Sequence, residues 1–273
     1  MMRALRDETA QHTFPIDVRH CYEGCQAENG NINHNKVFHA VRPNDRDWVI
    51  QSSANLGNRD SSWEQALYID AEHYTDIGEF FSQKLADDLC KSQPIPSGNQ
   101  DTVTPFDPTC PTTLGNGGFE SVFDGTMGAI HLGPNSERHA ILDWIANMGY
   151  EEGCEFQAAM GHLRPVFGAR NYAEEIILAL RELSARGCDV HVIFSDTAFA
   201  KTPDSYTPLF ELANADAANG QAPITLEHQL EDGRVHAKFF TWNGEWNGSS
   251  DGIVWSGSAN WYQTVLDLSL IHI

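Results

Sequence analysis

Apolar positions in the C-terminal half of the chain alternate between strand-like and helix-like spacing. Residues 155–163 (EFQAAMGHL) and 189–195 (DVHVIFS) are short apolar runs typical of buried strands. Between them, residues 171–187 carry apolar side chains at helical spacing and end at a glycine, a common helix terminus. A further helix is predicted over 137–149, and further strands over 224–230, 234–242 and 252–257. This strand–helix–strand order predicts an α/β fold.

The N-terminal half repeats part of the same order. Strands are predicted over 15–23, 34–41, 47–53 and 62–71, and a helix over 74–90. Residues 91–120 are rich in Pro, Gly, Ser and Thr without apolar periodicity, which is typical of a linker. We therefore divide the chain into 1–90, the linker 91–120, and 121–273. Each half lacks elements that the other has, so we expect a fragment truncated at both ends.

A short polar motif occurs once in each half. On a strand, alternate side chains share a face, so a His-x-Lys sequence presents an imidazole and an ammonium together. Each His-x-Lys is followed, at a similar distance, by Ser-Ala-Asn. The two copies are His34, Lys36, Ser53 and Asn55, then His236, Lys238, Ser258 and Asn260. Random placement of the histidines and lysines would give only about 0.2 His-x-Lys pairs in such a chain. A repeated set therefore indicates a functional site.

These residues resemble the phospholipase D superfamily, whose repeated signature is H-x-K followed by a G/S-S-x-N element. The resemblance implies duplicated α-β-α sandwich halves with mixed β-sheets, packed about a pseudo-two-fold axis. The first half would be the C-terminal part of repeat one, and residues 121–273 would be repeat two without its C-terminal end. One departure concerns the family's Asp, five residues after the Lys, which is Val41 in one copy and Asn243 in the other. In the family, that Asp supports the fold more than the chemistry. Its absence here therefore narrows the range of subfamilies that the chain can resemble, and it does not remove the reaction.

The residue types suit a reaction on a phosphodiester without a metal or another cofactor, as the resemblance implies. The anionic phosphate needs fixed cations, which Lys36 and Lys238 supply, while the Asn and Ser side chains add neutral donors. One neutral histidine attacks phosphorus to form a phosphohistidine, and the other, protonated, donates to the leaving oxygen. The resemblance implies that His34 is the nucleophile and His236 the general acid and base. Glu64 matches the family's glutamate that orients a histidine.

Charge favours a phospholipid over a nucleic acid as the phosphodiester. The chain has 17 Lys and Arg against 38 Asp and Glu, a formal net charge of −21, which repels polyanions at long range. No apolar run is long enough to span a membrane, so stable membrane insertion is not expected. Two alternatives stay open, an endonuclease of the same superfamily and an inactive binding module. The oligomeric state is also open.

The six cysteines favour an oxidising compartment, and hence a secreted or periplasmic protein. Cys154 and Cys188 precede two predicted strands at equivalent places, so these thiols meet if the strands are parallel neighbours. Pairs Cys21–Cys25 and Cys90–Cys110 are also conceivable, and buried reduced thiols are the alternative. A zinc site at Cys21 and Cys25 lacks a second pair of ligands.

The remaining histidines and the aromatic residues receive structural interpretations. His131, His139, His162 and His191 are single histidines, for which a structural or surface role is expected. Aromatic residues cluster around the second motif: Trp242, Trp246, Trp255, Trp261 and Tyr262. They suit either a substrate pocket or the core, and we favour the core.

Overall fold

The structure is a computed structural model that describes part of the chain. The described residues are 19–20, 37–40, 48–52, 62–63, 66–70, 93–94, 130–131, 140–164, 171–196, 202–229, 234–246, 248, 250, 252–257, 260–261 and 270–272. The described region is thus most continuous between 140 and 261. The helix predicted over 74–90 lies outside the described residues, and so does most of the predicted linker.

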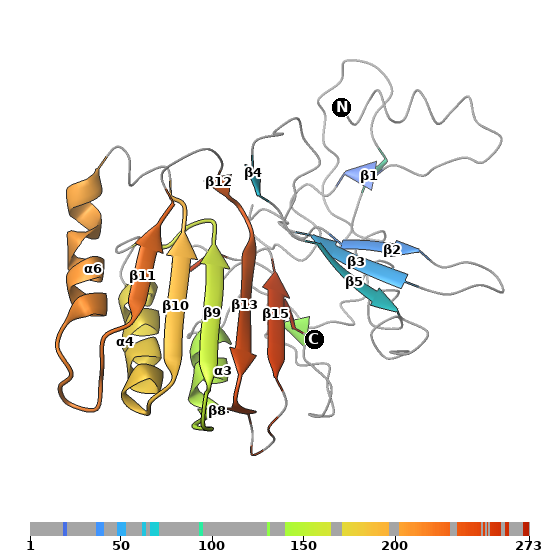
Figure 1. Cartoon of the computed structure of the whole chain (residues 1–273). Helices are drawn as coiled ribbons and strands as arrows, with labels where there is room; N and C mark the ends of the chain where they lie inside the picture. The colour runs from blue at the N-terminus through green and yellow to red at the C-terminus, as the bar shows by residue number, and fades with distance from the viewer. Residues whose placement is uncertain are drawn as a thin grey trace.

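A seven-stranded mixed sheet forms the centre of the fold, in the order β11-β10-β9-β13-β15-β16-β7 (Figure 1). Strands β9, β10 and β11 are parallel neighbours, and β13, β15, β16 and β7 continue the sheet in antiparallel fashion. The strands are β7 (Ile130–His131), β9 (Glu155–Met160), β10 (Asp189–Phe194), β11 (Thr225–His228), β13 (Lys238–Asn243), β15 (Ile253–Gly257) and β16 (Leu270–His272). The predicted α/β class with mixed sheets is therefore confirmed.

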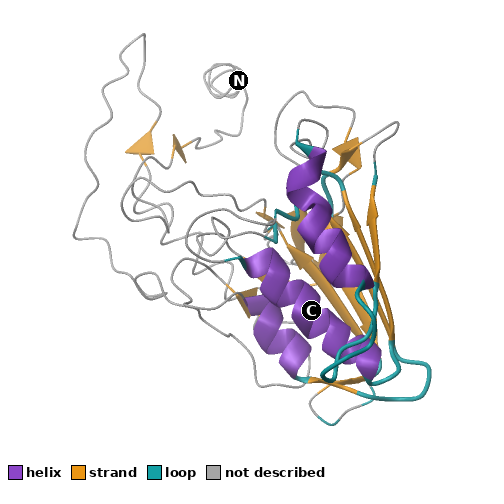
Figure 2. Cartoon of the chain, turned by 90° about the vertical axis from the view of Figure 1, so that its left-hand side faces the viewer, coloured by secondary structure: helices purple, strands orange, loops and turns teal. Residues whose placement is uncertain are grey.

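Helices α3 (Ala140–Ala146) and α4 (Tyr172–Ala185) pack against one face of this sheet (Figure 2). Helix α4 begins after Asn171, whose side chain accepts a hydrogen bond from the Glu174 backbone, and it is followed by Gly187 at φ +106°. That positive φ explains the glycine predicted at the helix end. A 3-10 turn, η2 (Pro203–Tyr206), leads into α6 (Thr207–Asn214), which contacts α4 and β11. Within the described residues, no helix is both long and apolar enough to cross a membrane.

The core lies between the sheet and α3 and α4, because alternate residues of each strand point toward the helices. Phe156, Ala158 and Met160 of β9 are buried, and their partners in β10 and β13 are buried beside them. Trp144 of α3 meets the ring of Phe240 edge-on, at a centroid distance of 6.0 Å. Buried tryptophans complete the core: Trp242, Trp255 and Trp261. For these three residues, the core interpretation of the aromatic cluster is confirmed.

The strand predicted over 234–242 is two strands. β12 (Arg234–Val235) pairs in parallel with β4 (Ser62–Trp63), whereas β13 begins at Lys238 and pairs with β9 and β15. The chain changes its pairing partner between them, so His236 and Ala237 belong to neither ladder. The prediction that His236 and Lys238 share one face of one strand is therefore wrong.

The N-terminal half contributes a separate three-stranded antiparallel sheet. It consists of β2 (Val37–Ala40), β3 (Trp48–Ser52) and β5 (Ala66–Asp70), in the order β2-β3-β5. The run predicted as one strand over 62–71 is divided between β4 and β5. β3 contacts β15 of the large sheet, which brings the two halves together (Figure 1). Two short pairs complete the described strands: β1 (Arg19–His20) with β6 (Gln93–Pro94), which lies in the predicted linker, and β8 (Met148–Gly149) with β14 (Glu245–Trp246).

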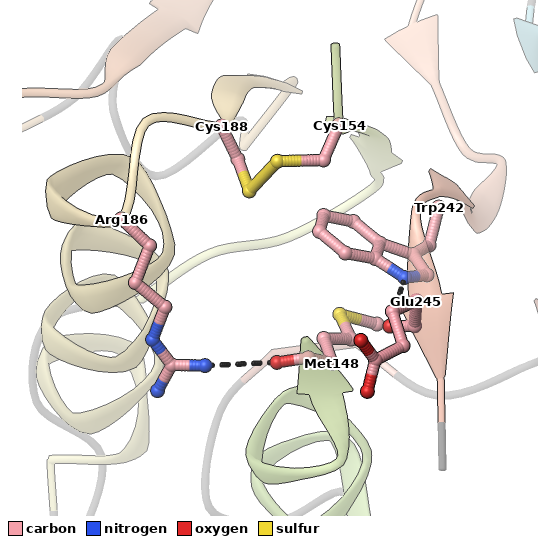
Figure 3. Close-up of a disulfide and its surroundings, with 6 residues drawn as sticks. All are labelled: Met148, Cys154, Arg186, Cys188, Trp242 and Glu245. Atoms are coloured by element: carbon pink, nitrogen blue, oxygen red, sulfur yellow. Dashed lines mark hydrogen bonds between the residues drawn. A yellow bond between two sulfur atoms is a disulfide. The ribbon is translucent and has the colours of Figure 1, made fainter. Parts of the chain in front are cut away.

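A disulfide joins Cys154 and Cys188 at the starts of β9 and β10 (Figure 3). Because the two strands are parallel neighbours, the residues that precede them lie side by side, as the sequence predicts. Close by, Arg186 donates a hydrogen bond of 2.8 Å to the Met148 carbonyl, and Trp242 Nε1 donates to the Glu245 carbonyl. The disulfide thus closes a loop that contains β9 and α4. The other four cysteines lie outside the described residues.

Replacing both cysteines (Cys154→Ala with Cys188→Ala) should lower the free energy of unfolding by about 4 kcal/mol, because it opens this loop in the unfolded chain. The sequence separation of the two cysteines is 34 residues. Urea unfolding measures the change. Either single substitution should cost about as much as the pair, since each one opens the loop. An unchanged unfolding midpoint would show that the disulfide does not stabilise the fold.

Candidate functional site

The candidate site lies at the carboxyl edge of the parallel strands β9, β10 and β11. In α/β sheets this edge is where ligands bind, because the loops that leave the strands there can converge. Lys238, the first residue of the antiparallel β13, pairs with Met160, the last residue of β9. The second His-x-Lys sequence is therefore placed at this edge by strand register.

Three residues of the second motif converge on Gly161, which directly follows β9. A Cβ atom at Gly161 would lie 3.1 Å from Oδ1 of Asn260, 3.3 Å from Nζ of Lys238 and 3.4 Å from Cα of His236. The first two distances are shorter than ordinary van der Waals contact and the third is at its lower limit, so a side chain at this position would require its neighbours to shift by a few tenths of an ångström. Glycine at position 161 thus keeps the backbone of β9 close to all three residues.

Backbone contacts hold Asn260 in this position. The amide of Trp261 donates a hydrogen bond of 3.1 Å to the carbonyl of His162, and Leu163 forms a parallel bridge with Trp261. Trp261 is itself fully buried. The segment after β15 is therefore attached to the segment after β9, so the Asn260 side chain has a defined place beside Gly161.

Lys238 is buried, with none of its surface exposed, and its Nζ donates a hydrogen bond to the carbonyl of His236. Burying an ammonium group is costly unless the charge is compensated. In such a low-dielectric place a cation attracts an anion far more strongly than it does in water. Nζ of Lys238 and Oδ1 of Asn260 thus lie at one edge of the sheet, each within 3.3 Å of the place where a Cβ of Gly161 would be.

A second polar cluster lies beside the first, around the buried carboxylate of Asp196. Asp196 follows β10, and its Oδ2 accepts a hydrogen bond of 2.7 Å from Nε of Arg164. Nη2 of Arg164 lies 3.5 Å from Oδ1, and Nδ1 of His162 lies 3.1 Å from the same oxygen. Tyr206 is the fourth member through a hydrogen bond to Asp196. We call His162, Arg164, Asp196 and Tyr206 the Asp196 cluster.

Burial and the Asp196 charge control titration in and beside this cluster. Burial first, and the neighbouring carboxylate second, raise the pKa of Tyr206 well above its usual range, so its hydroxyl stays protonated. His228 at the end of β11 donates from Nε2 to the Asp196 carbonyl at 3.2 Å. Burial lowers the pKa of His228, although its contact with Asp196 acts in the opposite direction.

The predicted site residues divide into two groups. His236, Lys238 and Asn260 are described, and they lie together at Gly161. The others lie outside the described residues: His34, Lys36, Ser53, Asn55, Ser258 and Glu64. Across the part of the chain that the structure describes, no group of three or more His, Cys, Asp or Glu side chains is placed to hold a metal ion.

Sequence reasoning missed the polar residues that join this edge. His162 was expected to be a single structural or surface histidine, yet it contacts Asp196, and Gly161 and Arg164 received no role. One signal was available, because polar residues that directly follow parallel strands gather at one edge of the sheet. Gly161, His162 and Arg164 follow β9, and Asp196 follows β10.

Comparison with known proteins shows distant similarity in fold. No family model matches the chain, and neither does any curated protein. The structure is similar to that of polyphosphate kinase from Porphyromonas gingivalis, with a TM-score of 0.49 and 12% sequence identity. The alignment covers 90% of this chain but 31% of the kinase. A similarity this distant assigns no function.

If Lys238 binds an anion, replacing it with methionine should abolish the binding of inorganic phosphate, because the substitution removes the buried ammonium at this edge. The loss of stability should be small, because an apolar side chain of similar size avoids the desolvation cost of the charge. Isothermal titration with inorganic phosphate measures binding, and urea unfolding measures stability.

The matched control is Arg181→Met. Arg181 is also buried, but it donates to four carbonyls at the end of α6, those of Leu212, Ala213, Ala215 and Asp216. Its loss should lower the free energy of unfolding by about 3 kcal/mol. If Lys238→Met proved equally destabilising, Lys238 would have a structural role at this edge.

Stability should fall at acidic pH in a way that depends on His228. Its pKa in the folded protein is below the ordinary value of 6.5, so folding favours the neutral ring. The stability that the neutral His228 ring contributes is fully present above pH 6.5. It is lost as the pH falls through the lower pKa of the folded state, because His228 takes up its proton at a higher pH in the unfolded chain than in the folded protein. Unfolding free energies of wild type and His228→Gln, measured between about pH 8 and pH 5, should converge toward low pH. A constant difference would contradict the assignment.

Proposed function

We propose that this chain carries out metal-independent phosphodiester chemistry of the phospholipase D type, as a hydrolase or a transferase. One observation supports the proposal more than any other. His236, Lys238 and Asn260, which form one copy of the repeated motif, approach a single point above Gly161 at the carboxyl edge of a mixed α/β sheet. The ammonium of Lys238 and the carboxamide of Asn260 are groups that can donate hydrogen bonds to phosphoryl oxygens, and the backbone of His236 lies beside them.

The reaction has two steps in the proposed mechanism. First, the neutral imidazole of His34 attacks phosphorus, a nitrogen–phosphorus bond forms, and the bond to the leaving oxygen breaks as protonated His236 donates its proton. Second, neutral His236 takes a proton from water or an alcohol, whose oxygen attacks phosphorus and breaks the nitrogen–phosphorus bond. Lys36 and Lys238 stabilise the charge on the phosphoryl oxygens throughout, and Asn55, Asn260, Ser53 and Ser258 donate hydrogen bonds to them.

The pairing of β12 with β4 supports a role for Glu64. This parallel ladder ends with Val235 opposite Trp63, and the next residues along the chain are His236 and Glu64. We therefore propose that Glu64, contributed by the first half, orients the imidazole of His236. An orienting carboxylate sets the tautomer of such a histidine and stabilises its protonated form.

The arrangement of the two halves, the preferred substrate and the cellular location are part of the same proposal. Residues 1–90 and 121–273 would be two related halves about a pseudo-two-fold axis, joined by 91–120, with one motif from each half. The net charge of −21 favours a phospholipid substrate over a nucleic acid. The Cys154–Cys188 disulfide suits a secreted or periplasmic location, since disulfides persist in oxidising compartments.

The two histidines should differ in how they affect a p-nitrophenyl phosphodiester labelled in its phosphoryl group. His236→Asn should release about one equivalent of p-nitrophenol and retain the label, because this leaving group needs little protonation. His34→Asn should do neither, because it lacks the nucleophile. Stopped-flow absorbance measures the release, and trapping of acid-denatured protein measures the label.

His191→Asn is the matched control, because His191 lies in the middle of β10, where its Nε2 is 3.5 Å from Glu227. This variant should turn over normally. Undiminished labelling of His34→Asn would refute the assignment of the nucleophile, and loss of wild-type activity in a chelator would refute the metal-independent mechanism. Faster cleavage of single-stranded DNA than of a short-chain phospholipid would favour the endonuclease alternative.

A further inference from the structure

Asp196 is enclosed by its partners, although the mechanism above gives it no role. Its side chain has no exposed surface, and its carboxylate accepts hydrogen bonds from Arg164 and from the hydroxyl of Tyr206. Tyr206 is also hydrogen-bonded to Arg164, so these three side chains form one internal network. The carboxylate is therefore an internal attachment point and not a group that meets a substrate.

The backbone that carries Asp196 is itself fixed on both sides of β10. The amide of Ser195 donates a hydrogen bond of 3.1 Å to the carbonyl of Met160, the last residue of β9. On the other side, the carbonyl of Asp196 lies 3.2 Å from Nε2 of His228, the last residue of β11. Asp196 is thus attached through its backbone to both strands that flank β10.

Asp196 in turn holds the segment that follows β9. Nδ1 of His162 lies 3.1 Å from Oδ1 of Asp196, and Nε of Arg164 donates to Oδ2 at 2.7 Å. Between these two residues, Leu163 is fully buried and forms a parallel bridge with Trp261. Alternate side chains of an extended segment point in opposite directions. One carboxylate therefore holds this segment at two points, on the side away from Leu163.

The same segment also fixes Asn260. The amide of Trp261 donates a hydrogen bond of 3.1 Å to the His162 carbonyl, and Trp261 is fully buried. Asn260 directly precedes Trp261, and its Oδ1 lies beside Gly161, as does Nζ of Lys238. A continuous series of contacts therefore leads from the buried carboxylate to the carboxamide of the repeated motif.

Stability alone explains this arrangement poorly. An ion pair that is removed from water adds little net stability, because the cost of desolvation offsets the attraction. A fully satisfied buried polar network does, however, rigidify the residues that it joins, because each donor must meet its acceptor. What the network around Asp196 joins is the edge of the sheet that carries the repeated motif, whereas the buried Arg181 donates to carbonyls at the end of α6.

We propose that Asp196 is a positioning residue for the phosphodiester reaction. Through His162 and Arg164 it fixes the segment after β9, and through that segment it fixes the carboxamide of Asn260 beside Lys238. The proposal rests on the proposed function, in which Asn260 donates a hydrogen bond to a phosphoryl oxygen. Such a donor contributes most when it is fixed before the reaction begins, and a displacement of about 1 Å can lower the rate about a hundredfold.

A double-mutant cycle on a p-nitrophenyl phosphodiester tests this route. Asp196→Asn keeps the shape of the side chain but removes its charge, and it should lower kcat/KM about tenfold or more, mainly through kcat. Asn260→Ala removes the group that Asp196 is proposed to fix. In the Asn260→Ala background, Asp196→Asn should cost less than about threefold, because residues that act through one another are not additive.

Arg181→Met is the matched control for activity, because it disrupts a buried polar network elsewhere in the fold. Assayed at a temperature where it is fully folded, it should keep the wild-type kcat/KM although it is less stable. The positioning role is refuted by an unchanged kcat/KM in Asp196→Asn, by additive losses in the cycle, or by an equal loss in Arg181→Met.

Hydrogen exchange at single amides separates this proposal from the proposed function, because the measurement needs no substrate. In Asp196→Asn, the Trp261 amide should exchange about tenfold faster or more, because the segment that holds its acceptor carbonyl opens more often. The Ile224 amide, which donates to a carbonyl at the end of α6, should be unchanged. Arg181→Met should do the reverse, because Arg181 donates to the same carbonyl as Ile224.

His162→Ala removes one of the two attachments to Asp196 and provides a second variant if Asp196→Asn does not fold. It should accelerate exchange at Trp261 and leave Ile224 unchanged. An unchanged Trp261 amide, or equal acceleration of both amides, would overturn the positioning role. If wild type turns over no phosphodiester while the two amides respond as expected, the proposed function fails and the attachment of Asn260 to Asp196 stands.

Discussion

Hydrogen bonding along both edges of β9 determines where every described residue of the candidate site lies. β9 pairs in parallel with β10 and antiparallel with β13, and its last residue, Met160, lies opposite both Phe194 and Lys238. This register brings the segment after β10 and the start of β13 to Gly161. A shift of one residue would turn alternate side chains to the other face of the sheet. The residues of β9 that pack against the helices in the core therefore also determine where the candidate site lies.

The edge of the sheet also concentrates buried charge. Asp196 is compensated within the protein by the guanidinium of Arg164 and by a hydrogen bond from Tyr206, and Nδ1 of His162 lies 3.1 Å from its Oδ1. Lys238 is buried at the same edge, where its Nζ donates to the His236 carbonyl. Two buried charges of opposite sign thus lie at one edge of the sheet.

Much of the fold could be predicted from local sequence patterns. The strands around Phe156 and Val192 and the helix that ends before Gly187 follow from apolar periodicity, because a side chain at a buried position must be apolar. The contact between Cys154 and Cys188 could be predicted only on the condition that two such strands are parallel neighbours, which the structure shows them to be. The division at His236 could not be predicted, because β12 and β13 pair with different strands and both look apolar in sequence. Helix α6 was missed, since eight residues give a weak periodic signal.

By itself, the sequence determined the strand and helix pattern and the residue types of the repeated motif, because periodicity and spacing are local properties of the chain. The tertiary structure alone decided that Gly161 lies against Lys238 and Asn260, and that Asp196 holds His162 and Arg164. Asp196 and Arg164 are 32 residues apart. Only the parallel register of β9 and β10 brings them within hydrogen-bonding distance, and register depends on how whole strands pair.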